Sequence, residues 1–169
     1  MQKVQKLKSL RLQIDKLWHG REKTSDGDYE KIVNLYFQIL KLEPKDTNAW
    51  EDTVWLLWSL SINKKNVRYL DTAEKVVLDY LKHNNNGYRA YEYVGLFYRQ
   101  YKPDTKRAIL YYQSAVKFPD CTISGFRGLT TLFANSGDKM RAIENCKFTL
   151  KHFPNDSWTK NKIIVLSSR

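Results

Sequence analysis

Apolar residues along the chain recur at intervals of three and four positions, and this spacing predicts helices rather than strands. The clearest stretch runs from Asp28 to Pro44, where one face would carry Tyr29, Ile32, Val33, Tyr36, Ile39 and Leu40. Pro44 should end this helix, because the residue before a proline avoids the helical backbone region. The chain contains only seven glycines and four prolines, so an all-helical protein is expected.

Three sets of marker positions repeat at a common spacing. Small or aliphatic residues stand at Ile32, Ala73, Ala108 and Ala142, with spacings of 41, 35 and 34 residues. Helix-ending residues (Pro44, Asn85, Pro119, Pro154) and large aromatic residues (Trp50, Tyr91, Phe126) follow the same spacing. The underlying period is therefore about 34 residues. The excess falls between Leu60 and Leu70, where polar residues predict a lengthened loop near 61–69.

These positions resemble the tetratricopeptide repeat (TPR), a helix-turn-helix unit of about 34 residues with a Trp-x2-Leu-Gly-x2-Tyr, Ala-x3-Phe and Pro pattern. The best match runs through Phe126, Leu129, Phe133, Gly137, Asp138, Ala142, Ile143 and Pro154. A second runs through Tyr91, Val94, Gly95, Tyr98, Ala108, Tyr112 and Ala115. The resemblance implies an all-α, right-handed α-solenoid of about four hairpins followed by a C-terminal capping helix.

The length of 169 residues suits a single domain, expected to span the whole chain. Residues 1–27 should form a basic, degenerate first helix and turn, residues 28–154 the repeats, and residues 155–169 the capping helix. One hairpin cannot bury its own apolar face, so neighbouring hairpins must stack. For the first and last helices two interpretations remain open, namely a cap or the seam of a dimer.

The resemblance also implies a concave groove, lined by the first helix of each hairpin, that binds a peptide or helix of a protein partner. By the repeat register its residues are Asn48, Glu51, Asp52, Trp55, Arg89, Tyr93, Leu96, Arg99, Arg127 and Asn135. Tryptophan and tyrosine beside arginine are typical of interface hot spots. The alternative is that Trp55 and Trp58 only pack against the first helix.

The charge balance indicates an alternative kind of partner. Lys and Arg total 29 against 18 Asp and Glu, which gives a net charge of +11. A basic patch is expected from Lys3, Lys6, Lys8, Arg11, Lys64 and Lys65. It would suit RNA, another nucleic acid or an anionic surface. Glu51, Asp52 and Glu92 share the predicted groove with Arg89 and Arg99, however, and carboxylates repel phosphate, so a protein partner is favoured.

No motif in the sequence indicates an enzymatic activity or a metal site. Glycine-rich phosphate loops, serine-elbow motifs and paired-histidine motifs are absent, and Cys121 and Cys146 form no Cys-x-x-Cys pair. We therefore expect no catalytic residues, no metal and no cofactor, and a non-enzymatic scaffold or adaptor. No window reaches the ~18 uncharged apolar residues of a membrane span and no apolar leader opens the chain, so a cytoplasmic protein is expected.

Overall fold

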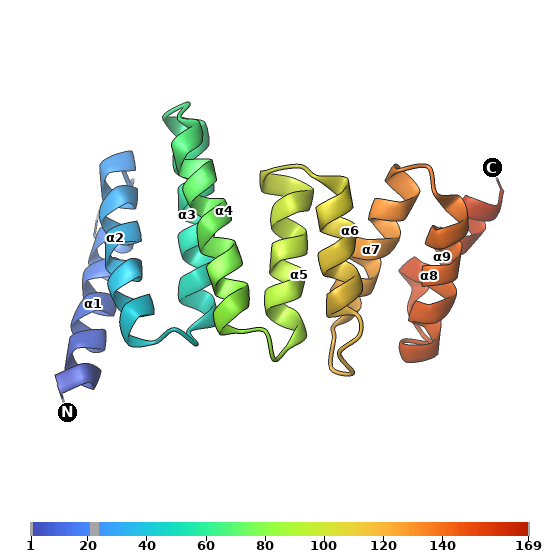
Figure 1. The fold of residues 1–169 in the computed structure, drawn as a ribbon, viewed down its shortest axis with the longest axis horizontal. Helices are drawn as coiled ribbons and strands as arrows, with labels where there is room; N and C mark the ends of the chain where they lie inside the picture. Colours follow the sequence, from blue (N-terminus) through green and yellow to red (C-terminus); the bar gives the residue numbers. More distant parts are fainter. Residues whose placement is uncertain (1, 21–23, 169) are drawn as a thin grey trace. The chain divides into compact units, whose positions relative to one another are not determined.

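The computed structural model describes residues 2–20 and 24–168, and within these ranges the regular structure is entirely helical (Figure 1). The helices are α1 (Gln2–His19), α2 (Asp26–Leu42), α3 (Thr47–Asn63), α4 (Val67–His83), α5 (Tyr88–Leu96), α6 (Thr105–Ala115), α7 (Ile123–Asn135), α8 (Lys139–His152) and α9 (Ser157–Ser167). A short π-helical segment, η1 (Phe97–Tyr101), continues α5. The prediction of an all-α helical-repeat fold is confirmed.

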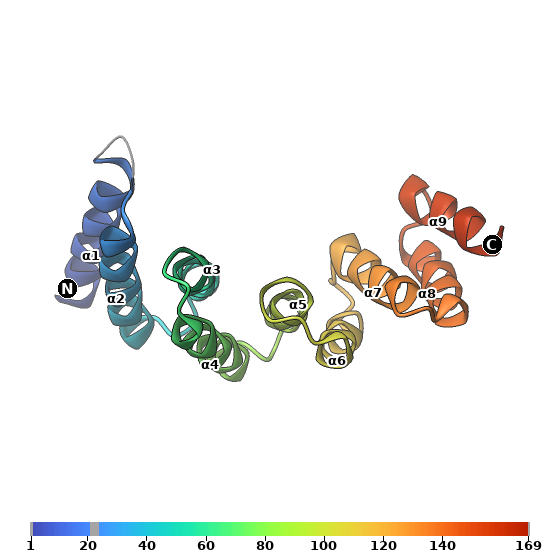
Figure 2. The same cartoon turned by 90° about the horizontal axis from the view of Figure 1, so that it is seen from above.

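The helices form hairpins that fall into two compact units. The first unit, Met1–Asn84, holds the hairpins α1/α2 and α3/α4, and the second, Asn85–Arg169, holds α5/α6 and α7/α8 with α9 packed on α8. Within the second unit, α6 and α8 lie on one side, and α5, α7 and α9 on the other (Figure 2). The first helix therefore completes a hairpin with α2. That the chain is one domain stays a prediction.

Side-chain caps set the starts of most helices. Ser25 and Asp28 form a capping box at α2, in which each side chain accepts a hydrogen bond from the other residue's backbone N–H. Aspartate or asparagine side chains accept backbone N–H groups at the starts of α3, α4, α6, α8 and α9, namely Asp46, Asn66, Asp104, Asp138 and Asp156. Each such cap stabilises a helix by about 1 kcal/mol, and together they fix the repeat boundaries locally.

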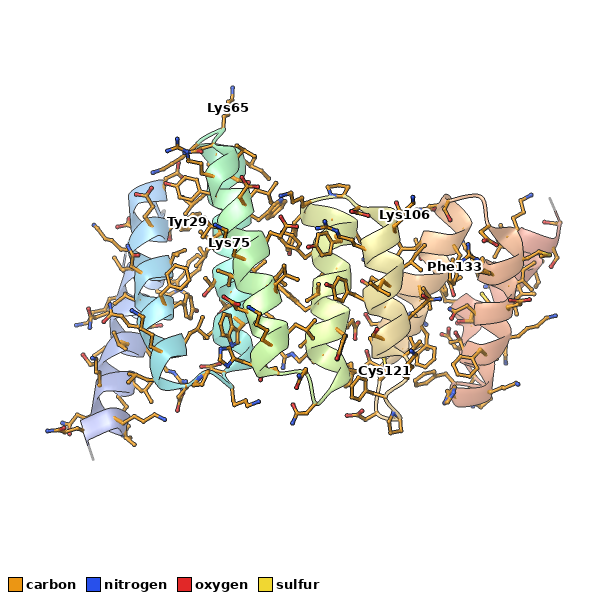
Figure 3. The ribbon with its side chains drawn as sticks, in the orientation of Figure 1. Tyr29, Lys65, Lys75, Lys106, Cys121 and Phe133 are labelled. Carbon is orange, nitrogen blue, oxygen red and sulfur yellow. The ribbon has the colours of Figure 1, made fainter. Side chains whose placement is uncertain are left out.

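The turn between α3 and α4 corrects the expectation of a lengthened loop near 61–69. Both helices have 17 residues, and only positions 64–66 separate them. The extra residues extend both helices, because Leu60 is fully buried and the hydroxyl of Tyr69 donates a hydrogen bond to Glu30. Lys65, at the tip of this turn in Figure 3, has a φ of 49°, in the left-handed region. Gly137 takes the same region after α7, with a φ of 81°.

Small residues let the paired helices approach closely. Ala73, Ala108 and Ala142 are all completely buried, as the repeat pattern predicts. In the second unit the ring of Tyr112 lies between Gly95 of α5 and Gly128 of α7, so close that a Cβ on Gly128 would lie 2.6 Å from the ring. Burial raises the pKa of Tyr112 to about 12, so its hydroxyl stays protonated.

Candidate protein-interaction site

The predicted groove residues lie on the first helix of three hairpins, and the boundary between the two units divides them. Asn48, Glu51, Asp52 and Trp55 lie on α3, in the first unit. The others lie in the second unit: Arg89, Tyr93 and Leu96 on α5, Arg99 on η1, and Arg127 and Asn135 on α7.

In the first unit, α1, α2 and α3 enclose a depression of about 360 Å³, here called the acidic depression. Its polar lining comes from all three helices and from the cap of α3: Arg11, Asp15, Tyr36, Asp46, Asn48 and Asp52. Ile14, Ile39, Ala49 and Trp18 supply apolar surface. Of the residues predicted from sequence, Asn48, Asp52 and Arg11 thus come together here.

An aromatic cluster consisting of Trp18, Tyr29 and Trp55 brings together rings from α1, α2 and α3. Ring centroids are 5.5 Å apart for Trp18 and Tyr29, 6.2 Å for Trp18 and Trp55, and 6.3 Å for Tyr29 and Trp55. Trp55 packs against the first helix, as the alternative interpretation held, yet 38% of it remains exposed. Trp18 also lines the acidic depression, so the two features are continuous.

Carboxylates dominate the charge of the acidic depression. Arg11 Nη2 lies 2.8 Å from Glu43 Oε2 and 2.9 Å from Asp46 Oδ2, so the guanidinium is engaged by two acids. The hydroxyl of Tyr36 donates to Asp52 Oδ2 at 2.7 Å. Burial, followed by the hydrogen bond to Asp52, raises the pKa of Tyr36 far above its ordinary value, so this hydroxyl remains a donor.

Glu51, which was predicted to face the groove, instead turns toward α4. Its Oε1 accepts a hydrogen bond from the hydroxyl of Tyr80 at 3.1 Å, and Tyr80 is completely buried. Glu51 therefore helps to join α3 to α4, and it does not line the acidic depression.

Two arginines of the predicted groove make contacts within the second unit. Arg127 forms a two-point ion pair with Asp156, the cap of α9, and lies 5.4 Å from the ring of Trp158. The bond from Arg127 lowers the pKa of Asp156 to about 2. Arg99 lies 5.8 Å from the Tyr112 ring. Arg127 therefore helps to hold the terminal helix on the repeat before it.

The remaining groove residues of the second unit differ in exposure. Arg89 and Asn135 are exposed, whereas Tyr93 and Leu96 are half-buried on α5.

The predicted basic patch is divided between opposite ends of the first unit. Lys3, Lys6 and Lys8 are exposed in the first half of α1. Lys64 lies at the other end of the hairpins, 2.5 Å from Glu30 near the start of α2, and this contact raises the pKa of Lys64. Since Arg11 is paired with acids, the six residues do not form one surface. Two further basic residues of the N-terminal segment, Arg21 and Lys23, lie outside the described residues.

Residues 2–20 and 24–168 contain no cluster of three or more His, Cys, Asp or Glu that could hold a metal ion. Both cysteines are buried, and burial with the charges of Glu92 and Asp120 raises the pKa of Cys121 to about 12. Such a thiol is not ionised at neutral pH. None of the helices described is long and apolar enough to cross a bilayer.

The architecture is shared with several solved structures. MamA superposes with a TM-score of 0.62 at 17% identity, covering 96% of this chain and 81% of its own. PilF of Pseudomonas aeruginosa gives a TM-score of 0.63 at 14% identity, covering 98% of this chain and 69% of its own. A thermophilic TPR protein of Thermus thermophilus gives 0.54 at 16% identity, covering 97% and 100%. The chain thus has the TPR fold, which confirms the resemblance found in its sequence.

No family model matches the chain, and no curated protein matches its sequence.

Proposed function

We propose that this protein is a non-enzymatic interaction scaffold that binds a peptide or helix of a protein partner at the acidic depression and the adjoining aromatic cluster. The observation that carries the proposal is the exposed face of Trp55, held by Trp18 and Tyr29 beside a depression lined by Asp15, Asp46 and Asp52. Tryptophan and tyrosine anchors next to charged groups are the usual composition of binding hot spots.

The chemistry of this surface selects a partner segment with a cationic side chain. A lysine or arginine entering the acidic depression would meet the carboxylates of Asp15 and Asp52, while Asp46 is shared with Arg11. Its alkyl stem would lie against Trp18, whose ring face also attracts a cation by up to about 2 kcal/mol. An apolar neighbour in the partner would then cover Trp55. The proposed ligand is thus a basic segment with at least one apolar residue.

The same features argue against nucleic acid at this surface, because the carboxylates repel phosphate and Arg11 is already paired. Lys3, Lys6 and Lys8 remain the place where an anionic ligand would bind the first unit. A complex held by these lysines would lose affinity steeply with salt.

The proposal is tested with displayed 12-residue peptides selected on the full-length protein. Trp55→Ala should lower the affinity for the selected peptides at least tenfold, because truncating a hot-spot tryptophan removes about 2 kcal/mol or more of binding free energy. Asp52→Asn, which keeps the shape of the side chain and removes its charge, should lower the affinity for peptides that carry lysine or arginine. Ile62→Ser and Asp120→Asn serve as matched controls, since both residues are exposed outside the site.

Binders that tolerate both Trp55→Ala and Asp52→Asn would contradict the proposal. A parallel measurement with a labelled single-stranded RNA separates the alternative. RNA binding with a steep salt dependence, lost when Lys3, Lys6 and Lys8 are changed to glutamine, would make the first half of α1 the functional surface.

A further inference from the structure

A second groove lies between α6 and α8 in the second unit, with a volume of about 760 Å³. Its floor is formed by Leu129 and Phe133 of α7, and its walls include Val116 after α6 and Phe148 of α8. Figure 3 marks Phe133 where α7 lies beside α8. We call this surface the α6–α8 groove.

The apolar surface of the groove is held in place before any partner binds. Phe148 is 43% exposed, and its ring packs on Phe126 at 5.9 Å and on His152 at 4.8 Å. Leu129 and Phe133 are fixed in the buried core of α7, each 3% exposed. An apolar ligand would therefore meet a preformed surface, which reduces the conformational entropy lost on binding.

Basic side chains surround this apolar floor. Lys117 stands on the α6 side, and Arg141 and His152 stand on α8, separated by Glu144, the only acidic residue of the lining. Lys117 makes no ion pair with any carboxylate in the described part of the chain. Arg141 pairs with Asp138 and also lies 4.9 Å from the Phe133 ring, which places its charge at the edge of the groove.

The side of α6 that borders the groove continues this pattern. Lys106, Leu110, Gln113 and Lys117 follow one another at helical spacing, and all four are exposed. Lys106 lies at the start of α6 (Figure 3). The exposed Leu110 thus adds one apolar side chain beside the groove, with a lysine one helical turn before it and another two turns after it.

We propose that the α6–α8 groove docks an amphipathic α-helix of a partner protein, with apolar residues at positions i, i+3, i+4 and i+7 and with glutamate or aspartate on its flanks. Helix-in-groove recognition has this pattern of anchors. The apolar anchors would cover Phe148 and Val116 above the buried Leu129, and an acidic flank would pair with Lys117, while Arg141 adds positive charge at the edge of the groove.

Charge complementarity argues for an acidic partner helix and against a second copy of this chain. The net charge of the protein is +11, and its terminal helices are basic. α1 contains five lysines and arginines and one aspartate, and α9 contains Lys160 and Lys162 without an acidic residue. Either helix placed in the groove of another copy would bring like charges together, which is unfavourable.

This inference is independent of the proposed function, because it uses another unit and the opposite charge. The acidic depression would select a basic segment, and the α6–α8 groove an acidic helix. A protein with both surfaces would join two different segments.

A display library of helical peptides tests the proposal on the full-length protein. Apolar residues are fixed at the four anchor positions, and the flanking positions vary among Glu, Lys and Ser. Selection should enrich glutamate at the flanks. The selected peptides should bind the Phe148→Ser and Lys117→Glu variants at least about tenfold more weakly, the loss expected when a hot-spot side chain is removed.

Two variants on α9 serve as matched controls. Val165→Ser removes an apolar side chain of similar exposure, 46%, and Lys160→Glu reverses an exposed lysine. Both variants should bind the selected peptides with an affinity within about twofold of that of the wild type. Since Phe148 also packs on Phe126, far-UV circular dichroism must show that Phe148→Ser is folded. Should it unfold, Lys117→Glu and the affinity for peptides with lysine flanks decide the question.

Several results would overturn the proposal. These are a selection without enrichment, enrichment of lysine, and binders that are indifferent to Phe148→Ser and Lys117→Glu. Sedimentation equilibrium showing a dimer that Phe148→Ser dissociates would assign the groove to a second copy. Binding of a labelled RNA that is lost in Lys117→Glu and retained in Phe148→Ser would assign it to phosphate.

Discussion

The contact between Gly128 and Tyr112 gives the sharpest prediction for stability. In Gly128→Ala the new methyl carbon would lie 2.6 Å from Tyr112 Cε1 and 2.8 Å from Cζ. Carbon atoms in contact prefer about 3.5–4.0 Å. The ring cannot move away, because on its other side it lies against the backbone of α5 at Gly95, where a Cβ would be 2.8 Å from it.

Two opposing effects set the magnitude. Overpacking of a filled core costs about 1–3 kcal/mol, and the two short contacts place this site in the upper part of that range. Alanine is favoured over glycine inside a helix by about 1 kcal/mol. We expect Gly128→Ala to lower the free energy of unfolding by about 1–2 kcal/mol.

A double-mutant cycle tests the cause. Urea unfolding followed by far-UV circular dichroism is measured for the wild type, Gly128→Ala, Tyr112→Leu and the double variant. Once the ring is replaced, Gly128→Ala should be neutral or stabilise by up to about 1 kcal/mol. The coupling should be about 2 kcal/mol. Additive effects, or a stabilising Gly128→Ala in the wild-type background, would refute the reasoning.

Three further predictions follow from groups of known environment. The pKa of Asp156 is about 2 in the folded protein against an ordinary 3.8, so its contribution to stability is complete above about pH 4 and is lost as the pH falls toward 2. Thermal unfolding of Arg127→Gln across this range should show a flatter pH dependence than the wild type, and an unchanged profile would contradict the assignment. Cys121 and Cys146 should react with a thiol reagent at pH 8 only after denaturation, and rapid labelling of the folded protein would show that burial does not protect them. Lys65→Asn should raise the free energy of unfolding by about 0.5–1 kcal/mol, and the melting temperature with it, since asparagine tolerates the left-handed region better than lysine. A lower melting temperature would argue against strain at the turn.

The helices themselves are largely determined by local sequence. Apolar spacing of three and four predicts where they lie, and the side chains of Ser25, Asp46 and Asp138 fix where they begin, because a cap bonds to backbone groups within three residues. The buried positions Ala108 and Ala142 follow directly from the repeat period. Polarity misled the prediction at 61–69, because the polar residues Ser61 and Asn63 lie in the last turn of α3, and only positions 64–66 form the turn.

The candidate site depended on contacts that the sequence does not specify. The register placed Asp52 and Trp55 on the correct helix, but it missed Asp15, Trp18 and Tyr36, which reach the depression from α1 and α2. The only local sign was a tryptophan and an aspartate one turn apart in an otherwise basic helix.

What the sequence by itself determined is the repeated helical hairpin, since periodicity and caps act over a few residues. Only the tertiary structure decided which charges are available. The sequence predicts that Glu51 lines the groove and that Lys64 belongs to a basic patch, yet Glu51 bonds to Tyr80 and Lys64 to Glu30. The physical reason is that an ion pair or hydrogen bond depends on distances of about 3 Å between residues about 30 positions apart, and these are fixed only when the hairpins pack.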